Sequence, residues 1–317
     1  MPGDSLFATT ALVASAGIAS AQGITFDGAA EMGYSGGGAG IEEGFHQSID
    51  LGINFSGETD NGLTFGADID LEDALDEAVA GRDTTDTVNT NPDFRVFISG
   101  AFGNLTMGDT DGALDFVNQE ANTAGSPGSL DDAETEHPGY IGAYLDGTGS
   151  GQILRYDNTF GDFTFAASVE QNAVNTTNGN VGYAIGFGYT LGLAAGSVTF
   201  GLGYQEAAGL NNGSTIDGSA ALALDSGFEA TLRLGQFEGD VANTDAFSWG
   251  LGLGYAFGPF AVHANYGNID NDVGADNEGY GIAASYDLGG GAGLHLGYSD
   301  GNGTYQDRYS FGLAMSF

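Results

Sequence analysis

Carboxylates are the most abundant side chains able to do chemistry in this sequence. Asp and Glu number 43, against 5 basic residues, all of them arginine, and the formal net charge is −38. A surface of this charge repels nucleic acid, so the electrostatic requirement of a nucleic-acid binder is not met. Divalent cations or high salt are the simplest means of screening the charge. We therefore expect cations, and not polyanions, among the partners.

Two short stretches have the density of oxygen ligands that Ca²⁺ or Mg²⁺ prefers. One is Asp109 with Asp111, and the other runs from Asp270 and Asp272 to Asp276 and Glu278. Neither has the full spacing of an EF-hand loop, so the motif is weak. We expect no required cofactor, with Ca²⁺ as an optional ligand.

The residues needed for catalysis are present but form no known catalytic pattern. The four histidines are His46, His137, His263 and His295, and there is no cysteine. No HExxH motif, phosphate-binding loop or marked nucleophile accompanies them. We expect no catalytic residues, and we expect the histidines on strands to line water.

Alternation of apolar with small or polar residues is the strongest pattern in the chain. Every second residue is apolar from Phe247 to Phe257 and again from Tyr309 to Phe317, which is typical of a strand with two different faces. The same pattern predicts about sixteen strands, near 24–34, 46–56, 62–72, 93–102, 104–109, 152–160, 163–171, 181–191, 196–206, 215–224, 227–237, 246–257, 259–267, 278–288, 292–299 and 307–317.

The connections between these strands alternate in length. Long ones, of which 110–151 is the longest, are separated by tight ones such as Gly103, Gly161-Asp162 and Gly258. Transmembrane barrels have this asymmetry, with short periplasmic turns and long external loops. The polar faces carry many carboxylates, among them Asp27, Glu31, Asp157, Asp217 and Glu229, which a dry core could not hold. The pattern favours an all-β transmembrane antiparallel barrel with a wet lumen over a large soluble β-sandwich.

The first 21 residues differ from the rest. Leu6 to Ala21 is weakly polar and ends in Ala19-Ser20-Ala21, like the apolar region and cleavage site of a secretory signal peptide. The usual basic residues at the start are missing. We expect a signal-peptide-like segment at 1–21, followed by one β-barrel domain at 22–317.

Three segments resemble the general (non-specific) porins of alphaproteobacteria. They are Asn61 to Ala67, Val96 to Gly103 followed by Met107-Gly108-Asp109, and Tyr280 to Gly291. The C-terminal Phe317 after an alternating strand resembles the assembly signal of outer-membrane barrels. The resemblance implies a sixteen-stranded homotrimer in the bacterial outer membrane, in contact with its lipid and lipopolysaccharide, with the third external loop, 110–151, folded into the pore.

The resemblance also implies which side chains control passage. Candidates at the pore constriction are Asp109, Asp111, Asp115, Glu120, Asp131, Asp132, Glu134 and Glu136 on the loop, with Arg95 and Arg155 on the wall. Candidates for the lumen wall are Asp50, Asp68, Asp70, Arg233 and Arg308, and Asp109 with Asp111 is the candidate metal pair. The chain has fewer basic residues than the family pattern, so a strong transverse field is in doubt and a preference for cations is expected.

The function expected from this resemblance is passive diffusion of ions and small hydrophilic solutes. Two alternatives stay open. A substrate-specific channel would show saturable block by its solute, and an outer-membrane barrel hydrolase would need a nucleophile that no motif marks.

Overall fold

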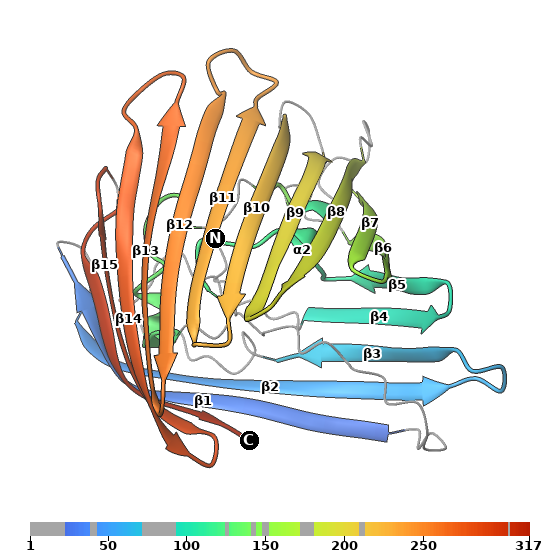
Figure 1. Ribbon diagram of the computed structural model, residues 1–317, viewed down its shortest axis with the longest axis horizontal. Coiled ribbons are helices and arrows are strands. Elements are labelled where there is room, and N and C mark those ends of the chain that lie inside the picture. Colours follow the sequence, from blue (N-terminus) through green and yellow to red (C-terminus); the bar gives the residue numbers. More distant parts are fainter. Residues whose placement is uncertain are drawn as a thin grey trace.

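The computed structural model describes residues 23–38, 43–71, 93–123, 127–140, 144–147, 152–171, 181–208, 213–303 and 305–317. Within them, sixteen strands form one closed antiparallel barrel (Figure 1). The strands are β1 (Gly23–Gly37), β2 (Gly44–Glu58), β3 (Thr64–Asp70), β4 (Asp93–Gly100), β5 (Gly103–Gly108), β6 (Ile153–Phe160), β7 (Phe163–Glu170), β8 (Gly182–Leu193), β9 (Gly196–Glu206), β10 (Ser214–Leu224), β11 (Phe228–Glu238), β12 (Ala246–Phe257), β13 (Phe260–Asn271), β14 (Asn277–Gly289), β15 (Ala292–Gly301) and β16 (Arg308–Ser316).

Each strand pairs with its neighbours in the chain, and β1 pairs with β16 to close the ring. Closure leaves no edge strand with unpaired backbone groups, which is the condition for a sheet to span lipid. The prediction of about sixteen strands is confirmed, with boundaries shifted by a few residues. The largest shift is in β13, which continues to Asn271 beyond the predicted end at 267.

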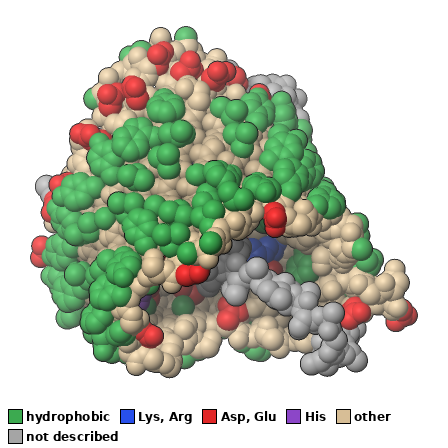
Figure 2. Space-filling model, in the orientation of Figure 1, with side chains coloured by type: hydrophobic (Ala, Val, Ile, Leu, Met, Phe, Trp, Pro, Cys, Tyr) green, Lys and Arg blue, Asp and Glu red, His purple; other side chains and the backbone are tan. Residues whose placement is uncertain are grey.

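The two faces of the barrel are as different as the alternation predicts. On β12, Leu251 and Leu253 are exposed on the outside, while the alternating Gly252 and Gly254 are buried against the interior. Hydrophobic side chains cover a broad band of the outer face in Figure 2, with acidic side chains at its border. Among the described residues, no helix is long and apolar enough to cross a membrane.

Glycine makes the tight turns possible. Gly258, between β12 and β13, has φ +60°, a left-handed conformation that costs a residue with a Cβ about 1 kcal/mol or more. Phe257 and Phe260 stack beside this turn with ring centroids 5.5 Å apart.

The segment after β5 turns into the barrel (Figure 1). It contains the short helix α2 (Ala113–Val117) and the 3₁₀ turn η1 (Leu130–Asp132). Ala113, Leu114 and Val117 of α2 pack against Ala166 of β7 and Ala184 of β8. The hydrophobic core thus lies between this segment and the inner wall, and the prediction that loop 110–151 folds into the barrel is confirmed for its described residues. The segment predicted as signal-peptide-like, 1–21, lies outside the described residues.

Candidate functional site

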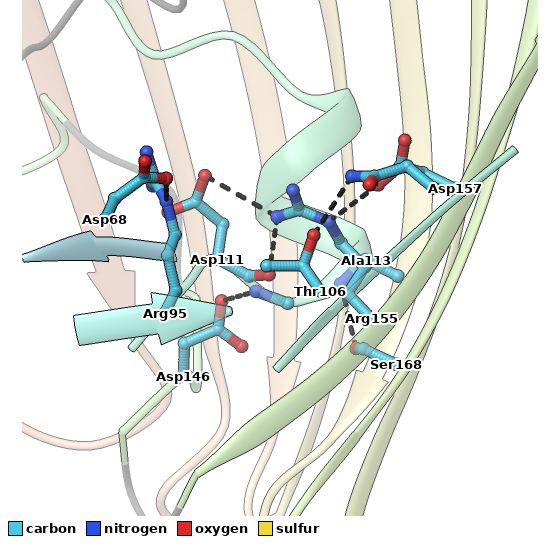
Figure 3. A network of polar contacts seen from close by, with 11 residues as sticks. Asp68, Arg95, Thr106, Asp111, Ala113, Asp146, Arg155, Asp157 and Ser168 are labelled. Carbon is cyan, nitrogen blue, oxygen red and sulfur yellow. Dashed lines mark hydrogen bonds and ion pairs between the residues drawn. The ribbon is translucent and has the colours of Figure 1, made fainter. Parts of the chain in front are cut away.

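The inner loop is tied at its base to the wall and to itself. The N–H of Ala113 donates to the hydroxyl of Ser168 on β7 at 2.9 Å. The N–H of Gly112 donates to Oδ2 of Asp146 at 2.6 Å, and Asp146 also accepts from the side chain of Gln205 on β9. Asp146 thereby joins the start of the loop to its end, and Figure 3 shows it beside the bond between Ala113 and Ser168.

Arg155 of β6 holds the first turn of the loop. Its Nη1 donates to the backbone carbonyl of Asp111 at 2.8 Å, and its Nε donates to Oδ1 of Asp157 at 3.2 Å. The guanidinium carbon lies 4.0 Å from the ring centroid of Phe116, a cation–π contact. The Arg155 side chain is only 9% exposed, so it positions the loop more than it faces the lumen (Figure 3).

Glycines on the inner wall form a seat for the loop backbone. A Cβ added to any of them would come closer than 3.0 Å to a loop atom, a distance that real Cβ atoms essentially never show. Examples are Gly186 and Gly201 against α2, Gly252 against Ala121, Gly281 against Glu134, and Gly297 against Ser129. The seat runs over β8, β9, β12, β14 and β15, and it accounts for part of the high glycine content.

The described arginines all form ion pairs with carboxylates. Arg95 of β4 pairs with Asp68 of β3 at 2.9 Å, directly across the strands. Arg308 of β16 pairs with Glu136 of the loop, also at 2.9 Å. Arg155 pairs with Asp157 as above, and the fourth pair, that of Arg233 with Asp217, is 2.7 Å long. Within the described part of the chain, the positive charge of the lumen is therefore locally compensated.

The Arg233–Asp217 pair corrects one prediction. Alternation correctly places Arg233 on the inner face, but its side chain is fully buried and does not line the water-filled lumen. Asp217 was expected to face water, and it too is fully buried. The loop causes this burial, because Asn118 lies against Asp217 and Ala121 lies against the wall beside Arg233.

The loop carboxylates predicted at the constriction differ in their exposure. Asp111, Asp131 and Asp132 are exposed, and Asp115 and Glu120 are half-buried. Glu136 contacts Arg308, and Glu134 is buried. Asp109 is exposed but stands apart from the loop, since its N–H bonds the carbonyl of the outward-facing Phe94. Whether passing solutes meet these side chains stays a prediction, as it does for Asp50, Asp68 and Asp70 of the wall.

Glu134 is held by Ser129 beneath η1. The Ser129 N–H donates to Oε2 of Glu134 at 3.0 Å, and the Ser129 hydroxyl donates to the same oxygen. Burial, with repulsion from Asp132, raises the pKa of Glu134 to about 8, although the hydrogen bonds oppose this shift. Glu134 is therefore mostly protonated at neutral pH, and it fixes the loop rather than adding charge to the lumen.

A second polar contact, missed by the sequence reasoning, fixes the loop to β13. Nε2 of His137 lies 2.6 Å from Oδ1 of Asn265, and Asn265 in turn contacts His263 at 3.0 Å. Alternation predicts that His263 and Asn265 face inward. No signal in the sequence indicates that His137 meets them, 128 residues away.

The predicted metal pair, Asp109 with Asp111, is not part of a larger cluster in the residues the structure describes. No group of three or more His, Cys, Asp or Glu residues there could hold a metal ion. The carboxylate of Asp111 lies 3.9 Å from Arg155. An optional Ca²⁺ ligand stays a prediction.

Known proteins resemble this chain in both sequence and fold. A family model described as Gram-negative porin matches residues 8–305. A porin of Rhodobacter capsulatus is 29% identical over 277 residues, covering 78% of this chain and 85% of that protein. A porin structure refined at 1.8 Å resolution has a TM-score of 0.74 at 23% identity, covering 93% of this chain and all of that one. A triple mutant of the Rhodopseudomonas blastica porin has a TM-score of 0.68 at 19% identity, with the same coverage. The family match spans most of the chain, which therefore belongs to the Gram-negative porin family and is a β-barrel integral protein of the outer membrane.

Proposed function

We propose that this porin is a general diffusion channel that favours cations, with loop 110–151 narrowing its lumen. Membership of the porin family and the barrel fold point to a channel and not to an enzyme. The preference for cations and the narrowing by the loop go further than family and fold, and they are supported by the charges and contacts of the inner wall.

The proposed selectivity rests on the ion pairs in which carboxylates neutralise the positive charges of the arginines. Each described arginine lies within 4.0 Å of a carboxylate, so none contributes an isolated positive charge. Lumen-facing carboxylates on the strands, among them Asp27, Asp50, Asp68 and Asp70, outnumber these arginines. Excess negative charge in a narrow aqueous passage raises the local concentration of cations and lowers their barrier to entry.

The seat of the loop supports the proposed narrowing. The described residues of loop 110–151 lie against β7 to β9 and β12 to β16, and Leu130 of the loop contacts Gly33 of β1. On this arrangement, solutes pass between the loop and the wall formed by β2 to β5. That wall carries Asp50, Asp68, Asp70 and the half-exposed Arg95.

Reversal potentials test the selectivity. The purified protein is inserted into a planar bilayer that separates KCl solutions of different concentration. We expect the sign of the potential that corresponds to K⁺ carrying more current than Cl⁻. The sign of an anion-selective channel would contradict the proposal, and the absence of any conductance would contradict a diffusion channel of any kind.

We also propose a homotrimer, which rests on the family relationship. Conductance steps that arrive in groups of three on insertion of the native protein would support it. Single, independent steps from a protein that migrates as a monomer would contradict it.

A further inference from the structure

His46 lies at a junction between the barrel wall and the inner loop. It faces the lumen from β2, opposite Gly33 of β1. Its Nε2 lies 3.3 Å from Oε2 of Glu31 on β1, and its Nδ1 lies 3.9 Å from Oδ1 of Asp131 in η1. Each ring nitrogen therefore faces a carboxylate, one from the wall and one from the loop.

This arrangement distinguishes the two protonation states of the ring. A neutral imidazole carries one N–H and can donate to only one of the two carboxylates. An imidazolium carries two N–H groups and can donate to both, with a positive charge between two negative ones. Only the protonated ring can bridge wall and loop.

The groups around His46 are otherwise acidic. β1 contributes Glu31, the loop contributes Asp131 and Asp132, and β2 itself contributes Asp50 two inward positions further along. Both loop residues have left-handed backbones, with φ +55° at Asp131 and +41° at Asp132, so this turn is held in a costly conformation. The residue before Asp131 is held in place, because Leu130 packs onto Gly33 and Gly312. When His46 loses its charge, the carboxylates of Glu31 and Asp131 face one another on either side of a neutral ring.

We propose that protonation of His46 bridges the wall to η1 and removes one negative charge from the lumen, so that the preference of the channel for cations rises with pH. This inference rests on the proposed cation-favouring channel and concerns its regulation. His46 is a positioning and selectivity residue here, and it acts through its charge on passing ions.

Two substitutions at this position bracket the effect. His46→Arg keeps a permanent positive charge, and His46→Gln keeps polarity without charge. Reversal potentials in a KCl gradient are recorded for both variants and the wild type from pH 5.5 to 8. One unit charge about 8 Å from a passing ion in water changes its local concentration about twofold. The charge acts on K⁺ and Cl⁻ in opposite directions, so the wild-type permeability ratio of K⁺ to Cl⁻ should rise about fourfold more than that of either variant, starting near the Arg variant and ending near the Gln variant.

Comparison of the wild type with the two variants also takes account of a second titrating group near His46. Burial, together with repulsion from Glu31, Glu136 and Asp131, raises the pKa of Asp132 to about 6, while His46 opposes this shift. Asp132 is present in all three proteins and contributes to all three curves, and a positive charge at position 46 lowers its pKa. The difference between the wild type and the variants reports His46.

A substitution in the loop tests the bridge itself. Asp131→Asn removes the carboxylate facing Nδ1, so the midpoint of the wild-type transition should move to a lower pH. The control, Asp111→Asn, neutralises a loop carboxylate beside Arg155 and should lower the preference for cations without moving the midpoint.

The outcomes separate the two proposals. Cation selectivity with identical pH curves for the wild type and His46→Gln would overturn the role of His46 and leave the channel proposal standing. A midpoint unmoved by Asp131→Asn would overturn the bridge to the loop. Anion selectivity in all the proteins at every pH would overturn the proposed function itself.

Discussion

The guanidinium of Arg233 and the carboxylate of Asp217 form a 2.7 Å ion pair with no exposed side-chain surface, between the barrel wall and the inner loop. Nη2 of Arg233 also donates to Ser248 on the next strand at 3.0 Å. Three neighbouring strands, β10 to β12, are thus joined by one guanidinium beneath the loop. A buried charge is costly once its partner is removed, so this pair is a sensitive point of the fold.

Arg233→Met should destabilise the barrel by about 3–5 kcal/mol, because it leaves Asp217 buried without its cation. The double substitution Arg233→Met with Asp217→Leu should recover most of that loss, since it removes both charges at once. Urea unfolding in detergent, followed by gel mobility of the folded and unfolded forms, measures both. The matched control is Arg95→Met, whose pair with Asp68 is half-exposed and should contribute about 1 kcal/mol or less. Equal losses for Arg233→Met and Arg95→Met would show that burial of the pair has no energetic consequence.

The glycine seat predicts a change in conductance from one added methyl group. In Gly252→Ala, the new Cβ would lie closer than 3.0 Å to the carbonyl oxygen of Ala121, so the loop must move away from the wall into the lumen. We expect a smaller single-channel conductance and a loss of about 1–3 kcal/mol in stability from overpacking. Gly192→Ala is the control, because Gly192 is also on the inner face of a strand but has no atom within 4 Å of an added Cβ. If both variants conduct like the wild type, the seat does not set the position of the loop.

The strands were predictable because alternation is a local property. Each strand carries its two faces in its own residues, and the tight turns are marked by glycines such as Gly103, Gly161 and Gly258. Alternation also indicates correctly that Arg95, Arg155 and Arg233 point inward. Alternation gives Asp109 the same side of the sheet as the outward-facing Met107, two residues before it, so its place at the constriction stays a prediction that local pattern does not support.

What covers the inner face could not be predicted from local patterns. Asn118 contacts Asp217 and Ser219 across about a hundred residues of sequence, and Asp146 meets Gln205 at a separation of 59. The lumen-facing glycines appear in the sequence only as an excess in composition. Their role becomes visible once the loop backbone is seen against them. Burial of Arg233 follows from those distant contacts and not from its own strand.

Glu134 should make the stability of the folded loop depend on pH. Its pKa is raised from 4.5 to about 8 in the folded protein, so the folded state holds the proton more tightly than the unfolded chain does. The stability contributed by this proton is complete below pH 4.5 and is lost as the pH rises toward about 8. In Glu134→Gln, the urea midpoint should therefore fall less between pH 5 and pH 8 than it does in the wild type. Glu136→Gln, a substitution at the loop carboxylate paired with Arg308, should keep the wild-type slope. Parallel curves for Glu134→Gln and the wild type would argue against a raised pKa.

The Arg95–Asp68 pair tests whether lumen charge sets the ion preference, because either the positive or the negative charge can be removed at the same place. Arg95 is 50% exposed and Asp68 is 25% exposed, so both can act on passing ions. Arg95→Gln leaves Asp68 uncompensated, and the permeability ratio of K⁺ to Cl⁻ should rise about fourfold, because one unit charge some 8 Å away changes the local concentrations of K⁺ and Cl⁻ about twofold in opposite directions. Asp68→Asn leaves Arg95 uncompensated and should lower the ratio by a similar factor. Reversal potentials in a KCl gradient give both values, and the opposite shifts should shrink at high salt because screening shortens the reach of each charge. Shifts of the same sign, or shifts that do not depend on salt, would mean that the pair influences permeation through its packing and not its charge.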